Sequence, residues 1–97
     1  MTISNLVFAQ PIGFGEPDCG QWVQSQTATS TLKQSNRAWL LGWVSGLNMN
    51  PLYNDALGKV NSAAQIYLWV DNYCKNNPLS GASVGGIMLL AELMKKP

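Results

Sequence analysis

Residues 35–47 read SNRAWLLGWVSGL and show the helical character of this chain most clearly. Apolar side chains recur in and just before this stretch three and four positions apart, which is the spacing of one face of an α-helix. The stripe consists of Leu32, Trp39, Leu40, Trp43, Val44 and Leu47. We therefore predict an amphipathic helix that begins at Gln34 or Ser35 and ends at about Leu47.

A second stripe on the same predicted helix consists of small residues, Ala38, Gly42 and Gly46, spaced four positions apart. Glycine inside a helix costs about 1 kcal/mol relative to alanine, so a compensating contact is expected. Close approach of another helix backbone would supply it, and we expect this stripe to pack in the core. The same spacing occurs in membrane helices, but the apolar stretch around it is too short to span a bilayer.

Two segments flank this helix. On its N-terminal side, Asp18 followed by Gln21 forms a capping-box pattern and predicts a short helix that carries Cys19, Trp22 and Val23. Residues 25–31, rich in Ser, Thr and Gln, are expected to form a loop. On its C-terminal side, residues 48–61 contain Asn-Pro, Asn-Asp and Gly, which favour turns, with one short helical turn around residues 55–57.

Two more helices follow. The third is predicted from Ser62, with Gln65 in the capping-box position, and stops at Asn77-Pro78 because the residue before proline avoids helical geometry. Its expected inward stripe is Ala63, Ile66, Tyr67, Val70 and Cys74, with Trp69 and Tyr73 as a neighbouring aromatic pair. The fourth is predicted from about residue 80 or 83 to 95, with the inward stripe Val84, Ile87, Met88, Ala91 and Met94.

The predicted fold is all-α, a small bundle of three longer helices and one short helix, because no strand-length segment alternates between apolar and polar residues. At 97 residues the chain is expected to hold one domain. We place the helical domain at residues 19–97 and a lead-in at residues 1–18. Residues 1–9 are interpreted as either the clipped end of a signal peptide or an N-terminal arm.

Composition excludes several function classes. Hydrophobic types make up 46% of the chain and charged types 11%, which is not the composition of a disordered chain. A net charge of +1 offers no basic field for nucleic acid. Histidine is absent, which removes the Ser-His arrangement and the commonest metal ligand. We expect no enzyme activity, no catalytic or metal-binding residues, no cofactor and no membrane insertion.

The two cysteines, Cys19 and Cys74, allow two interpretations. They are either unrelated buried thiols of a cytosolic protein, or one disulfide formed in an oxidising compartment, which supplements the limited core of a small domain. We favour the disulfide and therefore a periplasmic or secreted location.

Aromatic residues supply the candidate binding surface. Trp39, Trp43 and Trp69 lie on predicted inward stripes and are assigned to the core. Trp22, together with Met49, Pro51 and Tyr53 of the turn-rich connection, is assigned to a partner-binding surface, because exposed aromatic and apolar side chains concentrate binding energy. The low charged fraction also favours self-association or binding to a partner.

A family resemblance enters through two motifs. Residues 69–79 read WVDNYCKNNPL, and residues 19–22 read CGQW. A helix that ends in Tyr-Cys-Lys-x-Asn-Pro, with a second cysteine beside a tryptophan near the N-terminus, resembles the HdeA/HdeB-like periplasmic proteins. The architecture is also similar to that of type VI secretion amidase-immunity proteins. Both resemblances imply a non-enzymatic periplasmic protein that binds another protein, often as a homodimer.

Three functions follow as alternatives. The first is an exported HdeA/HdeB-like binding protein with a chaperone or stress-type role. Five carboxylates and no histidine give it only a modest acid switch, because few groups change charge as the pH falls. The second is an immunity or inhibitor protein whose residues 48–58 enter the cleft of a secreted effector. The third is a carrier of a small apolar ligand between the helices.

Overall fold

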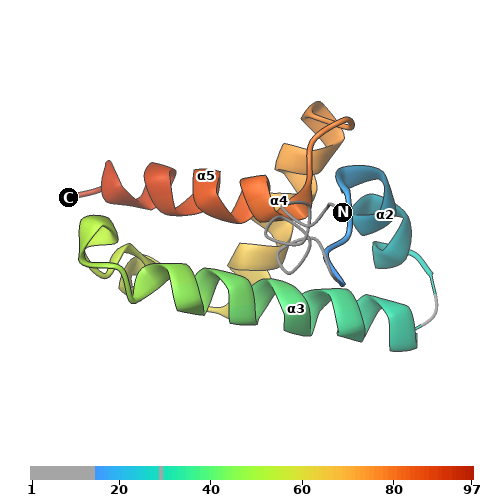
Figure 1. The fold of residues 1–97 in the computed structure, drawn as a ribbon, viewed down its shortest axis with the longest axis horizontal. Helices are drawn as coiled ribbons and strands as arrows, with labels where there is room; N and C mark the ends of the chain where they lie inside the picture. Colours follow the sequence, from blue (N-terminus) through green and yellow to red (C-terminus); the bar gives the residue numbers. More distant parts are fainter. Residues whose placement is uncertain (1–14, 29) are drawn as a thin grey trace, which may run out of the picture.

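The computed structural model describes residues 15–28 and 30–97, and every regular element in these ranges is a helix (Figure 1). The elements are α2 (Cys19–Gln26), α3 (Ser30–Asn48), the 3-10 turns η1 (Pro51–Tyr53) and η2 (Ala56–Lys59), α4 (Ala63–Asn76) and α5 (Ala82–Met94). The predicted all-α fold with three longer helices and one short helix is confirmed for the described residues. The expected signal-peptide remnant or N-terminal arm falls on residues outside these ranges, and the division between residues 1–18 and 19–97 stays a prediction.

Helix ends agree with the sequence where local capping decides them. Asp18 accepts the N–H of Gln21, and the Gln21 side chain accepts the N–H of Asp18, so the predicted capping box forms. The box predicted at Ser62 does not form: the Ser62 side chain makes no capping bond, and Gln65 Oε1 accepts the N–H of Asn61 rather than that of Ser62. As predicted, α4 stops just before Asn77-Pro78.

The expected loop at residues 25–31 is wrong at both ends, because α2 continues to Gln26 and α3 already begins at Ser30. Inside α2, the fully buried Ser25 donates its hydroxyl hydrogen to the carbonyl oxygen of Trp22. Arg37 Nε donates to Gln26 Oε1 across the two helices, and its guanidinium lies 4.5 Å from the centre of the Tyr67 ring. These tertiary contacts hold α2 and the first turns of α3 in place, which local sequence preference does not reveal.

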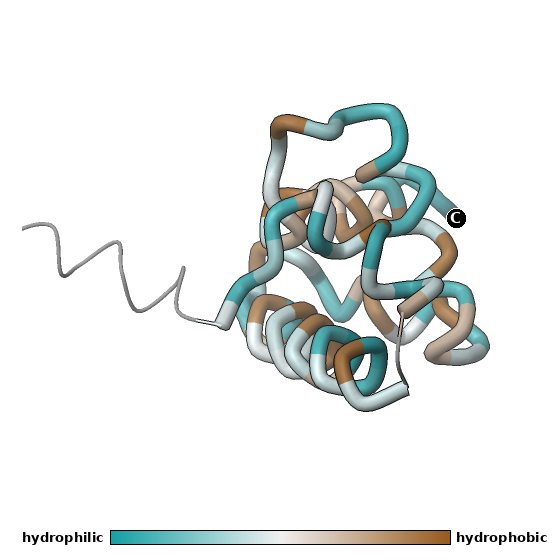
Figure 2. Tube along the Cα trace, turned by 90° about the vertical axis from the view of Figure 1, so that its right-hand side faces the viewer, coloured by the Kyte–Doolittle hydropathy of each residue, from teal (hydrophilic) through white to brown (hydrophobic). Residues whose placement is uncertain are grey.

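The helices α3 and α5 lie one above the other and run in the same direction, while α4 crosses between them at a steep angle (Figure 1). Viewed along its axis in Figure 2, α3 alternates hydrophobic and hydrophilic segments, as an amphipathic helix does. The buried apolar residues come from all four α-helices and η2: Cys19, Trp22, Leu40, Val44, Ala56, Ile66, Val70, Cys74, Ala82, Leu89, Leu90 and Leu93. The core thus fills the space enclosed by α3, α4 and α5, with α2 at one end.

The glycine pair of α5 lies in close contact with both of the other long helices. A Cβ atom on Gly86 would lie 2.9 Å from carbon atoms of Trp43 and Val44 on α3. A Cβ on Gly85 would lie 3.2 Å from Val70 and Tyr73 on α4. Trp43 Nε1 also donates to the carbonyl oxygen of Ser83 over 2.9 Å, in the first turn of α5. The absence of side chains at these two positions therefore allows α5 to pack against both neighbours.

The predicted role of the small-residue stripe on α3 is wrong. Ala38, Gly42 and Gly46 are exposed, and a Cβ added at either glycine would meet no other atom within 4 Å. The stripe faces away from α4 and α5, because Leu40 and Val44 turn the opposite side of α3 toward the core. Close helix approach uses the glycines of α5 instead.

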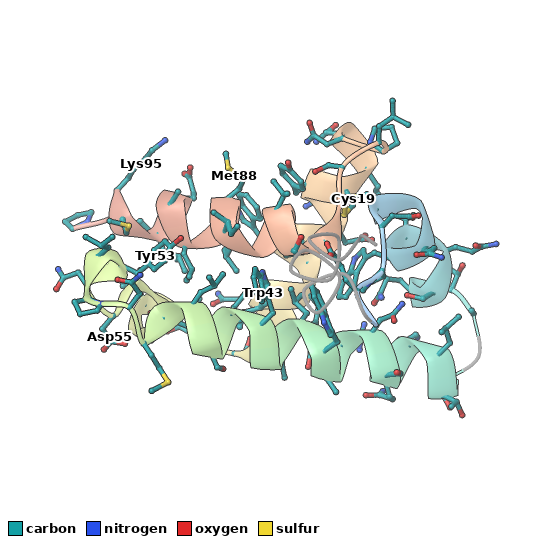
Figure 3. All side chains as sticks on the ribbon, in the orientation of Figure 1. Cys19, Trp43, Tyr53, Asp55, Met88 and Lys95 are labelled. Carbon is teal, nitrogen blue, oxygen red and sulfur yellow. A yellow bond between two sulfur atoms is a disulfide. The ribbon has the colours of Figure 1, made fainter. Side chains whose placement is uncertain are left out.

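The predicted inward face of α5 is also wrong, because the helix is rotated by about half a turn. Val84, Met88 and Met94 are each at least 40% exposed, and Ile87 and Ala91 are half-buried. Figure 3 shows Met88 pointing away from the body of the molecule. The buried side instead carries Gly85, Gly86, Leu89, Leu90 and Leu93. Apolar residues surround α5 on all sides, so their period alone does not identify the inward face.

The disulfide Cys19–Cys74 joins the start of α2 to the last turn of α4, with 4.7 Å between the two Cα atoms. Backbone bonds reinforce the connection: Cys19 N–H donates to the carbonyl of Ser80, and Ala82 N–H donates to that of Pro17. The carboxylate of Glu16 accepts the N–H of Ser83 in the first turn of α5. The beginning of the described chain is thereby fixed to the connection between α4 and α5. In the described part of the chain, no helix has the length and apolar character needed to cross a membrane.

Candidate functional site

The connection between α3 and α4 carries two of the most exposed large apolar side chains of the described residues. Met49 is 83% exposed and Leu52 is 78% exposed, and Pro51 between them is also exposed. We call residues 48–59 the terminal loop, because they lie at the end of α3, beside the end of α5 (Figure 1). When a partner covers exposed apolar side chains, the free energy of burial favours the complex and the loss of side-chain entropy opposes it.

Asparagine side chains fix the backbone of the terminal loop. Asn50 Oδ1 accepts the N–H of Leu52 over 2.9 Å, which caps η1 at its N-terminus. Asn48 Oδ1 accepts the N–H of Leu57 over 2.9 Å, and Asn48 Nδ2 donates to Asp55 Oδ1 over 2.8 Å. The Asn50 bond therefore fixes the first half of the loop locally, and the two Asn48 bonds tie its second half to the end of α3.

Two consecutive residues of the loop adopt left-handed backbone geometry. Asn54 has φ 51° and Asp55 has φ 53°. This region is unfavourable for side-chain-bearing residues, although Asn and Asp tolerate it better than others. Such conformations persist only where surrounding contacts over-determine them, and they concentrate at functional sites. Here the surrounding contacts are the asparagine bonds that fix the loop.

The loop is also anchored to the core and to α5. Ala56 is 1% exposed, and Tyr53, Leu57 and Val60 pack against the core cluster. Figure 3 places Tyr53 between α5 and the loop. The ammonium group of Lys59 donates to the carbonyl oxygens of Leu93 and Lys96 at the end of α5. The loop therefore presents Met49 and Leu52 from a scaffold attached to two helices.

The charges around this end of the molecule are mainly positive. Lys59, Lys95 and Lys96 supply three of the six basic residues of the chain, and they lie at or beside the end of α5. Of the nearby acidic residues, Glu92 lies 3.7 Å from the Lys95 ammonium, whereas Asp55 accepts a hydrogen bond from the uncharged amide of Asn48, which does not neutralise it. The charged side chains near the apolar tip are therefore of both signs, with Lys59 and Lys96 as the lysines that no carboxylate pairs with among the described residues.

Of the four residues that the sequence assigns to a partner surface, the structure places three in the terminal loop and one in the core. Met49, Pro51 and Tyr53 lie together in the terminal loop, with Met49 and Pro51 exposed and Tyr53 half-buried. Leu52 is not among the residues predicted for this surface, although an apolar residue between Pro51 and Tyr53 in a turn indicates an exposed side chain. Trp22 is 0% exposed, and its assignment to a partner surface is wrong. The capping box of α2 and the adjacent disulfide turn its indole into the core.

The other three tryptophans pack against the core but are only partly buried. Trp39 and Trp43 stack at 6.0 Å between ring centroids, and the predicted pair Trp69 and Tyr73 stacks at the same distance. Their apolar faces support the bundle while part of each ring stays in contact with solvent. The prediction that these three tryptophans belong to the core therefore holds only for the side of each ring that packs inward.

Comparisons with protein-family models, with curated proteins and with solved structures find no match to this chain. Function is therefore inferred from the chain's own geometry. Among residues 15–28 and 30–97, no three Cys, Asp or Glu side chains are placed to hold a metal ion. The feature that stands out is the rigid loop with its two exposed apolar side chains.

Proposed function

We propose that this chain is an exported, non-enzymatic protein that acts by binding another protein, and that the terminal loop makes the central contact. The observation that carries the proposal is the exposure of Met49 and Leu52 on a loop whose backbone is fixed by the Asn48 and Asn50 side chains. A preorganised loop loses little conformational entropy on binding, so more of its contact energy becomes affinity.

The disulfide supports a periplasmic or secreted location. Structural disulfides form and persist in oxidising compartments and are rare in the cytosol. The Cys19–Cys74 bond is consistent with that environment. An exported binding protein is also what the resemblance to HdeA/HdeB-like proteins and to type VI amidase-immunity proteins implies.

Of these two classes, the geometry of the loop favours the inhibitor or immunity class. A single rigid tip fits one complementary cleft, whereas binding many clients is helped by surfaces that can repack. Lys59 of the loop and Lys96, whose carbonyl oxygen accepts from it, would add attraction to an acidic rim and speed association. The partner expected is a secreted protein with an apolar cleft bordered by carboxylates.

A chaperone role is the second candidate, and the exposed side of α5 favours it. Val84, Met88 and Met94 expose apolar surface there, and methionine adapts its shape to different partners. A chaperone of the HdeA/HdeB type would gain apolar surface in acid. Dye binding and oligomeric state measured below about pH 3 separate the two roles, because carboxylates lose their charge in that range.

Site-specific crosslinking tests the proposal directly. A photoreactive phenylalanine analogue replaces Leu52 in the exported protein, and the control carries it at Leu79, which is fully exposed on the connection between α4 and α5. We expect one adduct of defined mass from position 52 and none from position 79. Adducts of many masses from both positions would favour a chaperone, and no adduct from position 52 would overturn the proposal.

Affinity for the captured partner then tests the contact itself. Leu52→Asp is expected to weaken binding by at least about tenfold, because it removes a central apolar contact and places a charge there. Leu79→Asp makes the same chemical change at a site of similar exposure and is expected to leave the affinity unchanged. Equal effects of the two variants would contradict a role for the loop.

A further inference from the structure

A groove of about 410 Å³ lies between α4 and α5 and is closed at one end by η2. Its volume falls in the range of about 300–1,000 Å³ that is usual for small-molecule sites. It is separate from the apolar tip of the terminal loop, since neither Met49 nor Leu52 lines it. The apolar contact proposed for the loop and the binding of a ligand in this groove therefore use different apolar residues, although Lys59 and Lys96 lie near both surfaces.

The groove has an apolar floor and one apolar wall. Leu89 and Leu93, one turn apart on α5, form the floor, and both are nearly buried. Leu68 and Trp69 of α4 form the wall, and Leu68 is 62% exposed although it faces this concave surface. The Trp69 ring is held parallel to that of Tyr73, which fixes the orientation of its indole. An aliphatic chain or an aromatic ring would cover the exposed parts of these side chains.

The end of the groove near η2 is positively charged. Lys59 and Lys96 line it, and no carboxylate is among the lining residues that the structure describes. Two protons of the Lys59 ammonium are donated to carbonyl oxygens at the end of α5, which fixes its position and leaves the third proton for a ligand. The carboxylate of Glu92, also on α5, is directed to Lys95 instead.

We propose that this groove binds a small monocarboxylate with an aliphatic or aromatic body. The body would lie on Leu68, Trp69 and the floor of the groove, and the carboxylate would pair with Lys59 and Lys96. Charge complementarity selects the anion, because an amine of the same size would meet two ammonium groups and no acidic side chain of the groove.

Calorimetric titration of the oxidised full chain with decanoate, 1-naphthoate, decanol and decylamine tests the charge requirement. We expect one of the two carboxylates, or both, to bind with a stoichiometry of one and a Kd below about 1 mM. Decanol and decylamine are expected to bind at least about tenfold more weakly. The proposal is overturned if neither carboxylate binds in this range, or if decylamine binds as well as decanoate.

Matched variants locate the site. Lys96→Glu is expected to weaken carboxylate binding by about tenfold, whereas Lys95→Glu makes the same charge change one residue away from the groove and should have a much smaller effect. Leu68→Glu should abolish binding and Leu79→Glu should not. Circular dichroism of each variant checks that it folds. Equal effects of Lys95→Glu and Lys96→Glu would overturn the assignment to this groove.

Tryptophan fluorescence supplies a second readout that a general loss of stability would not reproduce. Carboxylate binding is expected to change the emission of Trp69, which lines the groove, and not that of Trp39, which does not. The change should therefore vanish in Trp69→Phe and persist in Trp39→Phe. Persistence in both variants would place the ligand elsewhere and overturn the proposal.

Discussion

Glycine-to-alanine substitutions on α3 test the position of this helix in the bundle. Gly42 and Gly46 lie within α3, and a Cβ at either position would meet no other atom within 4 Å. Alanine is favoured over glycine inside a helix by about 0.8–1.0 kcal/mol, because glycine loses more backbone entropy on folding. With no steric cost, the free energy of unfolding should rise by that amount for Gly42→Ala. Gly46 lies in the last turn, where the gain is smaller.

The matched control is the same substitution on α5. In Gly86→Ala the new methyl group would lie 2.9 Å from carbon atoms of Trp43 and Val44, so the helix-propensity gain is opposed by overpacking. Overpacking of a close-packed core costs about 1–3 kcal/mol. We therefore expect Gly86→Ala to lower the free energy of unfolding by up to about 2 kcal/mol, although the chemical change is identical.

Urea denaturation of the oxidised protein, followed by circular dichroism, measures both changes. A thermal scan should show a melting temperature about 4–8 °C higher for each kcal/mol gained in a domain of this size. The refuting result is a loss of stability in Gly42→Ala of the size expected for Gly86→Ala. It would mean that the small-residue stripe of α3 packs against another helix. Repeating the measurement at two protein concentrations shows whether that helix belongs to a second copy.

Three further predictions use the same unfolding assay. Replacing both Cys19 and Cys74 by serine should cost about 4 kcal/mol in the chain-entropy model for a sequence separation of 55, measured against the oxidised protein; an unchanged midpoint would contradict it. Asn48→Ala removes two loop hydrogen bonds and should cost about 1–2 kcal/mol, with faster hydrogen exchange of the Leu57 amide, while Asn76→Ala serves as a helix-end control. Trp43→Phe keeps an aromatic ring packed against the core but removes the indole hydrogen bond to α5, and a loss of about 1–2 kcal/mol is expected; a neutral result would show that water replaces this bond.

Local signals predicted the helix ends at which a cap or a proline acts. The Asp18–Gln21 capping box and the stop before Asn77-Pro78 depend on residues within one turn of each other, and both appear as expected. The start of α3 was placed too late, because contacts of Arg37 with other helices support its first turns. Such contacts join residues that are distant in sequence and leave no local pattern.

The candidate site was predicted in part. The turn-rich composition of residues 48–61 and its apolar members pointed to Met49, Pro51 and Tyr53, which lie in one loop. The rigidity of that loop was not predictable, because it depends on where the Asn48 side chain reaches after the chain has turned. Trp22 was misassigned, because an aromatic residue beside a cysteine looks the same in sequence whether it faces the core or solvent.

The sequence alone determined the all-helical fold, the order of its helices and the candidate loop, because helix periodicity, caps and turn residues act over a few neighbouring positions. The apolar period also identified the buried faces of α3 and α4, where Leu40, Val44, Ile66 and Val70 are buried. Only the tertiary structure decided which face of α5 is buried and that the small-residue stripe of α3 is not. On α5, apolar residues surround the axis, and the buried face is the one where Gly85 and Gly86 let α3 and α4 come close. On α3, an equally suggestive small-residue stripe faces solvent, because Leu40 and Val44 bury more apolar surface on the other side.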